Sequence, residues 1–399
     1  MGSLDKINKL KPLISQEIPP LSKDIIFLWS SQLIWQFSAG MMGVFLPIFL
    51  FSFFEKNLEK VFFFYIFVFF VSALFLPLGT KIGLNFLGIK KSLIFSIPLL
   101  SFYYFCFYLL DKENYYFILI LAAFLVAFFR SFYWTPYHVD FLKFSQKNVR
   151  GRQFALFSAS LFLVGVVAPF TAGLIIKNFS LKVLFLISSI IVFFSIFPLL
   201  KIKKTQERFS FGYFQTFKTL FSKKFRKFFV GLSAIGAEEA VGTIVWPIFI
   251  FEILKGDHFA VGEITAIVVA SSMFLYIITG KYTDKIKDKR EFFKPVNYFY
   301  SLGWVLKSFV NSAFQIFAVN TYHSFMAILR GVPFGTFIYE MMADSGHYVD
   351  EYTALREIAL NIGRVLILFL CVILSSIFKL NINWIFLITA FVSLVINLF

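Results

Sequence analysis

Apolar runs long enough to cross a lipid bilayer recur along almost the whole chain. A helix needs about 20 residues to cross a hydrocarbon core of ~30 Å. Short charged connections separate runs near residues 25–53, 61–80, 92–110, 115–138, 153–176, 182–200, 228–252, 259–280, 292–310, 313–340, 354–377 and 382–399. The pattern predicts an all-α integral membrane protein with twelve transmembrane helices.

The composition excludes the soluble alternatives. Of the 399 residues, 59% are hydrophobic and 15% are charged, whereas soluble domains carry about 45–50% and about 25%. The net charge of +16 comes from Lys and Arg in the short connections rather than from one soluble basic face, so no nucleic-acid partner is expected. Cys106 and Cys371 lie apart in apolar runs and give neither a disulfide nor a metal pattern. No cofactor or metal is therefore expected.

Charged residues also divide the chain. Lys and Arg concentrate in the N-terminal tail and in every second connection, which predicts that both termini are cytoplasmic. The longest polar stretch after the tail, residues 201–227, is rich in Lys, Arg and Phe. We expect a cytoplasmic tail (1–24), a six-helix bundle (25–200), a basic cytoplasmic linker (201–227) and a second six-helix bundle (228–399). The linker fits either an amphipathic segment on an anionic leaflet or a solvated connection.

Short matches at one spacing indicate that the two bundles are repeats. Residues 47–49 and 247–249 both read Pro-Ile-Phe, Arg130 recurs as Arg330, and Asp140 recurs as Glu340, each 200 residues later. Gly79 recurs as Gly280 at an offset of 201. Because each half contains an even number of spans, the halves should be parallel repeats related by an axis along the membrane normal.

The chain resembles the major facilitator superfamily of secondary transporters. The connection after span 8, with Gly280, Asp284, Lys285, Lys289 and Arg290, is similar to the family's G-x-x-x-D-[RK]-x-G-[RK]-[RK] motif, with Lys287 at the second Gly position. The first-half copy has Gly83 where the family has Asp. Residues 168–173 (APFTAG) resemble the family's span-5 antiporter motif, in which Pro169 bends the helix and Gly173 allows close packing. The resemblance implies two rocking bundles that work by alternating access.

Charges inside the apolar runs are the best functional candidates, because a buried charge in a bilayer is costly. Glu238 and Glu239 lie near the middle of span 7, and we expect at least one of them to face a cavity and bind protons. A structural ion pair to another helix is the alternative. Arg130 and Arg330 lie at equivalent depths in spans 4 and 10, where they would attract an anionic solute or neutralise the two Glu. Arg364 in span 11 is expected to make a structural pair, and Lys307 to extend toward the outer surface.

Other polar and aromatic residues fall at two further levels of the bundle. The resemblance implies that spans 1, 4, 7 and 10 line the cavity, and these spans carry Gln32, Trp35, Gln36, Tyr133, Trp134, Trp246, Tyr322 and His323. Of these, we expect substrate contacts from Trp35, Gln36, Tyr133, Trp134 and His323. At the cytoplasmic helix ends, Asp140 and Glu340 are expected to form gating pairs with Arg150, Arg152 and Arg356, beside the Gly280 and Asp284 loop. The alternative is that these are solvated helix ends.

Together these features predict a monomeric secondary transporter of the plasma or inner membrane rather than an enzyme. The P-loop sequence G-x-x-x-x-G-K-[ST] does not occur, so the chain itself cannot use ATP through that motif. Proton-coupled export of an amphiphilic or drug-like solute is the leading expectation. Uptake of a sugar or an organic anion is the alternative. A membrane sensor with a transporter fold and a lipid-active membrane enzyme are alternatives of another class.

Overall fold

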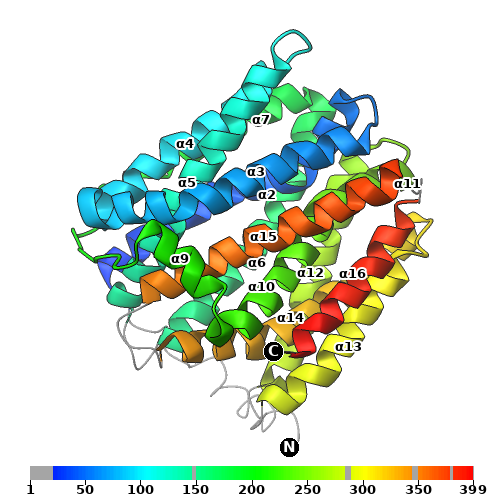
Figure 1. The fold of residues 1–399 in the computed structure, drawn as a ribbon. Coiled ribbons are helices and arrows are strands. Elements are labelled where there is room, and N and C mark those ends of the chain that lie inside the picture. The colour runs from blue at the N-terminus through cyan, green and yellow to red at the C-terminus, as the bar shows by residue number, and fades with distance from the viewer. Residues whose placement is uncertain (1–20, 146–149, 284–288, 344–348, 378–380, 399) are drawn as a thin grey trace, which may run out of the picture.

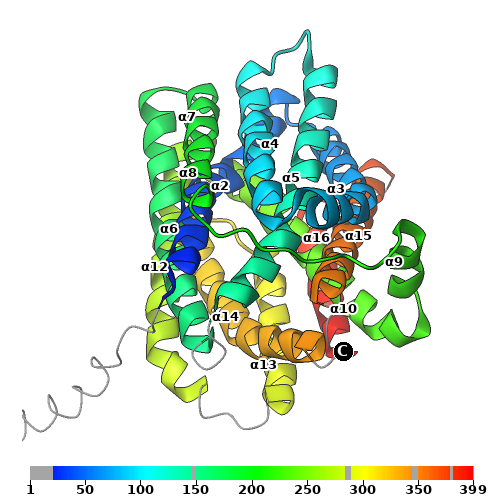
Figure 2. The same ribbon diagram turned by 90° about the vertical axis from the view of Figure 1, so that its left-hand side faces the viewer.

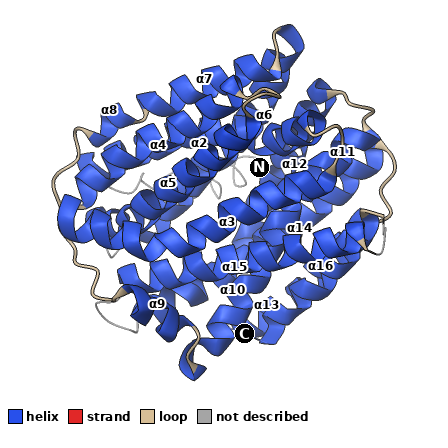
Figure 3. Ribbon diagram, turned by 45° about the horizontal axis from the view of Figure 1, so that its top comes forward, coloured by secondary structure: helices blue, strands red, loops and turns tan. Residues whose placement is uncertain are grey.

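The computed structural model describes residues 21–145, 150–283, 289–343, 349–377 and 381–398, and every regular element in these ranges is a helix (Figures 1 and 3). In chain order they are α2 (Lys23–Phe53), α3 (Leu58–Lys81), η1 (Ile82–Leu87), α4 (Ile89–Leu109), α5 (Tyr115–Phe144), α6 (Arg150–Asn178), α7 (Leu181–Phe194), α8 (Ile196–Leu199), α9 (Tyr213–Leu220), η2 (Lys223–Phe225), α10 (Arg226–Ala240), η3 (Val241–Val245), α11 (Trp246–Ile253), α12 (His258–Thr283), α13 (Lys289–Lys307), α14 (Ala313–Ala343), α15 (Val349–Ser376), α16 (Asn383–Val395) and η4 (Ile396–Leu398).

The helices have the length and composition of membrane spans. Within the described ranges, nine segments are long and apolar enough to cross a bilayer: Lys23–Phe53, Leu58–Leu87, Ile89–Leu109, Tyr115–Phe144, Ala159–Asn178, Leu181–Leu199, Lys223–Ile253, His258–Leu275 and Asp350–Ser376. Apolar side chains cover the outward surface as well as the interior: Phe62 is fully buried, whereas its neighbour Phe63 is exposed. Helices that are apolar all round suit a lipid environment. The predicted class, an all-α membrane protein, is confirmed.

Two hairpin turns have the same backbone hydrogen bonds 200 residues apart. After α2, the amides of Phe54, Glu55, Lys56 and Asn57 donate to the carbonyl oxygens of Leu50, Ser52, Phe51 and Phe54. After α11, the amides of Leu254, Lys255, Gly256 and Asp257 donate to those of Ile250, Glu252, Phe251 and Leu254. The next helix is then capped in both places, because Asn57 accepts a hydrogen bond from the Lys60 amide and Asp257 accepts one from the Ala260 amide.

Glycines allow some of the helices to touch backbone to backbone. A Cβ atom built on Gly363 of α15 would lie 1.8 Å from the carbonyl oxygen of Ser233 in α10, and one built on Gly236 would lie 2.0 Å from that of Leu360. Helix α12 approaches α6 in the same way, since a Cβ on Gly262 would lie 2.6 Å from the Pro169 carbonyl oxygen. Figure 1 shows α15 in the middle of the molecule, between α3 and α10.

The first half of the linker runs across the ends of several helices, in the direction from α8 to α9 (Figure 2). The Lys90 ammonium donates to the carbonyl oxygens of Leu200 and Ile202, at 2.7 and 2.8 Å. The Asn85 side chain exchanges two hydrogen bonds with the backbone of Phe209, at 3.0 and 2.8 Å. This segment is therefore neither a leaflet-bound helix nor a freely solvated connection, because its backbone is bound to the helix ends. We call this end of the molecule the linker end.

Candidate functional site

Two adjoining cavities lie at the centre of the molecule. The first, of about 460 Å³, is lined from α2, α3, α4, α5, α10, η3 and α15. The second, of about 330 Å³, is lined mainly from α10, η3, α11, α13 and α14. Glu239 and Thr243 line both cavities, so the two meet at the middle of the helix formed by α10, η3 and α11. We refer to them as the first and second cavities.

Glu238 forms the most buried ion pair of the site. Its side chain is 2% exposed, and both its oxygens accept hydrogen bonds from the Arg330 guanidinium, at 3.0 and 2.7 Å. The same guanidinium donates to Asn297 Oδ1 at 3.1 Å and lies 3.6 Å from the centre of the Tyr300 ring. A bidentate pair with two further contacts leaves little of the buried charge uncompensated.

Glu239 points in a different direction from Glu238, as expected of adjacent helical residues. Its carboxylate lies 2.6 Å from the Arg364 guanidinium of α15, and its side chain is 43% exposed. The predicted partner in the first half, Arg130, is instead hydrogen-bonded to Asn361 Oδ1 at 3.3 Å, an oxygen that also accepts from Arg364 at 2.8 Å. Arg364 does form the expected ion pair. It also lines the first cavity, where no functional contact was predicted for it.

Arg130 has no counter-ion in the described part of the chain. Its guanidinium lies 5.2 Å from the centre of the Phe69 ring, and no described carboxylate lies within 4.0 Å of it. The other cations of the first cavity are paired, Arg364 with Glu239 and Arg356 with Glu357 at 2.6 Å. The first cavity therefore has one positive charge in excess.

A π-helical turn interrupts the helix directly after the two glutamates. Residues Val241–Val245 form η3, and the Thr243 hydroxyl donates to the carbonyl oxygen of Glu239 at 2.6 Å. Such turns widen a helix locally and occur often at functional sites. The sequence analysis did not predict this turn. The only hint in the sequence Val-Gly-Thr-Ile-Val is that Gly242 and Thr243 interrupt an apolar run.

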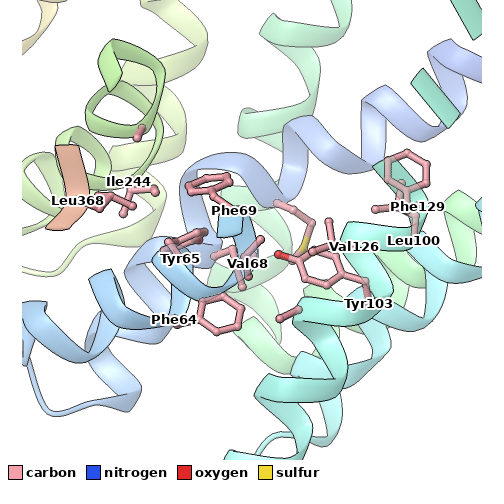
Figure 4. Packing of buried hydrophobic residues seen from close by; sticks show 14 of the residues in the cluster. Phe64, Tyr65, Val68, Phe69, Leu100, Tyr103, Val126, Phe129, Ile244 and Leu368 are labelled. Atoms are coloured by element: carbon pink, nitrogen blue, oxygen red, sulfur yellow. The ribbon is translucent and has the colours of Figure 1, made fainter. Parts of the chain in front are cut away.

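Aromatic side chains form much of the first cavity's lining. Figure 4 shows Tyr65 and Phe69 from α3 and Tyr103 from α4, all three of which line it. Trp35 and Trp134 also line it, at 5.8 Å between ring centres.

The predicted contact residues of this cavity occupy different places. Tyr133 is fully buried beside the cavity, where its hydroxyl oxygen accepts a hydrogen bond from Trp35 Nε1 at 2.7 Å. It supports the lining rather than contributing to it. Gln36 is half-buried and lines neither cavity.

The second cavity contains a buried lysine that sequence reasoning placed elsewhere. Lys307 is 3% exposed, and its ammonium lies 4.5 Å from the Trp246 ring centre and 4.3 Å from that of Trp304. Its position near the end of the helix suggested that it would extend to the surface, but it does not. His323, which we predicted to contact the substrate, lines the same cavity, and its ring lies 4.3 Å from that of Tyr300.

The predicted gating residues are only partly described. Asp140 is fully buried at the linker end and accepts a hydrogen bond from the Thr205 hydroxyl, and no ion pair to Asp140 occurs among the described side chains. Arg356 pairs with its neighbour Glu357. The side chains of Arg150, Arg152 and Glu340 and the surroundings of Gly280 lie outside the described part, as does Asp284 altogether.

Pro169 and Gly173 lie inside α6, where this helix approaches α12. A Cβ built on Gly173 would lie 3.5 Å from atoms of Phe259. No group of three or more His, Cys, Asp or Glu in the described residues could hold a metal ion. The site offers ion pairs and aromatic surfaces around an open space, which suits binding of a small solute.

An all-helical membrane protein with charged, aromatic cavities lined from several helices is compatible with a secondary transporter. The chain belongs to the major facilitator superfamily: the sequence profile described as "Major Facilitator Superfamily" matches residues 28–343. The predicted family is confirmed, and the protein is a transporter rather than an enzyme. Curated proteins include no significant match.

Solved structures of the same fold include a point mutant of the nucleoside transporter NupG, with a TM-score of 0.69 at 13% identity, covering 93% of this chain and 97% of that one. A proton-dependent oligopeptide (POT) family transporter has a TM-score of 0.69 at 12% identity, covering 93% of this chain and 98% of that one. At these identities the likeness is one of fold.

Proposed function

We propose that the chain crosses the membrane twelve times in two six-helix halves, residues 25–200 and 228–399. Helices α13, α14 and α16 would be the three spans in addition to the nine given above. Corresponding helices support this arrangement: α3 packs on α5 as α12 packs on α14, and α4 packs on α7 as α13 packs on α16. The two hairpin turns with equal hydrogen bonds 200 residues apart support a repeat independently of the side chains.

The cavities support proton-coupled movement of a small amphiphilic solute by alternating access, and export remains our leading proposal for its direction. The observation that carries it is the position of Glu239. Its carboxylate lies where the two cavities meet, is partly open to both, and is held by Arg364. A solute that binds at this ion pair competes with a proton for the Glu239 carboxylate, so solute and proton occupy the site in turn, as proton-driven export requires.

Glu239→Gln should abolish flux driven by a pH gradient, because an amide keeps the shape of the carboxylate but cannot exchange a proton. The solute for this assay is chosen from neutral amphiphiles, sugars and organic anions by its ability to raise the melting temperature of the purified protein. Radiolabelled solute flux is then measured in proteoliposomes with and without an imposed pH gradient.

Glu113→Gln serves as the matched control, because Glu113 is exposed in the turn before α5. We expect it to retain wild-type flux. Gradient-driven flux at the wild-type level in Glu239→Gln would refute proton coupling at this residue. Substrate-dependent turnover of a lipid without solute flux would refute transport itself and favour a membrane enzyme.

Uptake of an organic anion is a second candidate, and Arg130 is the observation that favours it. At the spacing of the repeat, the position equivalent to Glu238 is Ser38, whose hydroxyl donates to the Ser188 carbonyl oxygen at 2.8 Å. The first half thus keeps the arginine and lacks the acid that neutralises its counterpart. An anionic group on the solute would supply the missing charge.

The second half of the linker supports a location at an anionic cytoplasmic leaflet, with both termini on that side of a plasma or inner membrane. Helix α9 presents Phe214, which is 83% exposed, and Phe221 is also exposed. The basic residues Lys218, Lys223, Lys224, Arg226 and Lys227 follow within the same short segment. Aromatic and basic groups together bind the surface of anionic bilayers. We propose that the protein works there as a monomer.

A spin label attached at position 214 in Phe214→Cys should lie within the headgroup region of nanodiscs that contain phosphatidylserine. Cys106 and Cys371 are buried, so they leave the introduced thiol as the accessible one in the described chain. Power-saturation EPR with oxygen and a nickel chelate measures the depth. Equal nickel accessibility in anionic and zwitterionic nanodiscs would contradict the leaflet proposal, and Lys112→Cys in the opposite turn provides the water-exposed reference.

A further inference from the structure

The second cavity contains a lysine, Lys307, that no described carboxylate neutralises. The four charged lining residues of this cavity are Glu238, Glu239, Lys307 and Arg330. Glu238 is bound by Arg330 and Glu239 by Arg364, and no described carboxylate lies within 4.0 Å of Lys307. A buried ammonium without a counter-ion is costly, and its contacts with the two indole rings offset only part of that cost, so a ligand that carries a negative charge would stabilise it.

The groups around Lys307 define what that partner must be. An ammonium and an indole N–H can donate hydrogen bonds but cannot accept them. The ammonium lies between the rings of Trp246 and Trp304, and Trp246 Nε1 is buried without an acceptor in the described residues. His323 Nε2 is also buried without a described partner. The ammonium and the indole N–H are both donors at this wall, whereas His323 Nε2 can donate or accept.

The aromatic residues around Lys307 favour a ligand that carries a flat, apolar group next to its hydrogen-bond acceptor. Trp246, Trp304, Tyr300 and His323 line the second cavity, and Trp304 and His323 meet edge to face at 4.6 Å between ring centres. Residue 303 is a glycine, and a Cβ there would lie 2.4 Å from His323 Cδ2, so the backbone of α13 leaves room for this ring. The aromatic surface is therefore held in a fixed position beside the ammonium.

We propose that Lys307, Trp246 and Trp304 form a binding site for the carboxylate of an aromatic monocarboxylic acid, whose ring lies beside His323. One excess charge matches one carboxylate, and a charge-assisted hydrogen bond in a buried site is strong. The inference rests on the proposed transport of an amphiphilic solute and names its chemical class. It concerns the second cavity, separate from the excess charge of Arg130 in the first.

The test uses benzoate as the probe and benzamide as its neutral analogue, with the purified full-length protein in detergent. Saturation-transfer NMR and thermal stabilisation should show that wild type binds benzoate and not benzamide. Lys307→Met should weaken benzoate binding at least about tenfold, and Trp246→Phe, which keeps a ring but removes the N–H, should weaken it less. Lys177→Met is the matched control, because Lys177 is an exposed lysine 4.6 Å from the Phe259 ring centre.

The stability of the ligand-free protein tests the site without any ligand. Since no described carboxylate pairs with Lys307, Lys307→Met should leave the melting temperature unchanged or raise it. A lower melting temperature would show that Lys307 is a structural partner and would overturn the proposal. So would equal binding of benzoate and benzamide, no binding of benzoate up to roughly 10 mM, or full binding by Lys307→Met.

Binding and flux separate this site from the proposed function. Lysine-dependent benzoate binding without solute flux in proteoliposomes would retain the site and refute transport. Flux that Lys307→Met leaves unchanged for the solute selected by thermal stabilisation would retain transport and refute the site.

Discussion

Replacing Arg330 by Gln should lower the free energy of unfolding by about 3 kcal/mol or more, because the substitution leaves the Glu238 carboxylate charged and buried. Both carboxylate oxygens lose their partner, and the remaining environment is the protein interior. Glu238→Gln should have a similar effect, since the Arg330 guanidinium then remains without a counter-ion. Thermal unfolding of the purified protein measures the change.

The double substitution Glu238→Gln with Arg330→Gln distinguishes an ion-pair effect from simple loss of packing. Two amides of similar shape can bond to each other, so the double variant should be more stable than either single variant. Additive losses would contradict the account of a mutually dependent pair. Glu239→Gln is the comparison for exposure: its side chain is 43% exposed, so its effect on stability should be much smaller.

Gly363→Val should destabilise the protein by about 3 kcal/mol and reduce the yield of folded transporter. A side chain at this position would meet the Ser233 carbonyl oxygen, which is backbone and cannot rotate away, so α10 and α15 would have to separate. Size-exclusion chromatography and thermal unfolding after membrane extraction measure the effect.

Gly43→Val provides the control for this substitution. Gly43 lies in α2, and no atom lies within 4 Å of a Cβ built there, so the fold should tolerate it. Gly43 lines the first cavity, and we therefore expect slower transport with normal stability. Equal melting temperatures for Gly363→Val and wild type would contradict the close approach of the two helices.

The sequence was most informative where hydrophobicity decides the structure. Helices lie at the predicted apolar ranges in the described residues, with ends that differ by a few residues, because a helix satisfies its own backbone hydrogen bonds in an apolar environment. The cost of a buried charge likewise pointed to Glu238, Glu239 and Arg330 as residues of the interior, and the structure places all three at the cavities.

The partners of those charges could not be read from the sequence, because pairing depends on helix rotation and packing. Symmetry suggested that Arg130 would neutralise a glutamate, yet Arg364 of α15 does so, and Arg130 contacts Asn361. Lys307 was misplaced for the same reason. It ends α13, where a lysine can extend to the surface, but the rings of Trp246 and Trp304 enclose it. The π-helical turn η3 likewise follows from local packing rather than from composition.

At the linker end, the adjacent residues Phe209 and Ser210 are hydrogen-bonded to two different helices. Asn85, in η1, bonds the backbone of Phe209, and Glu351, in α15, accepts from the amide of Ser210 at 2.8 Å. Phe209 and Ser210 are joined by one peptide unit, about 3.8 Å between Cα atoms, which cannot lengthen. A movement of α15 away from η1 would therefore require at least one of these hydrogen bonds to break.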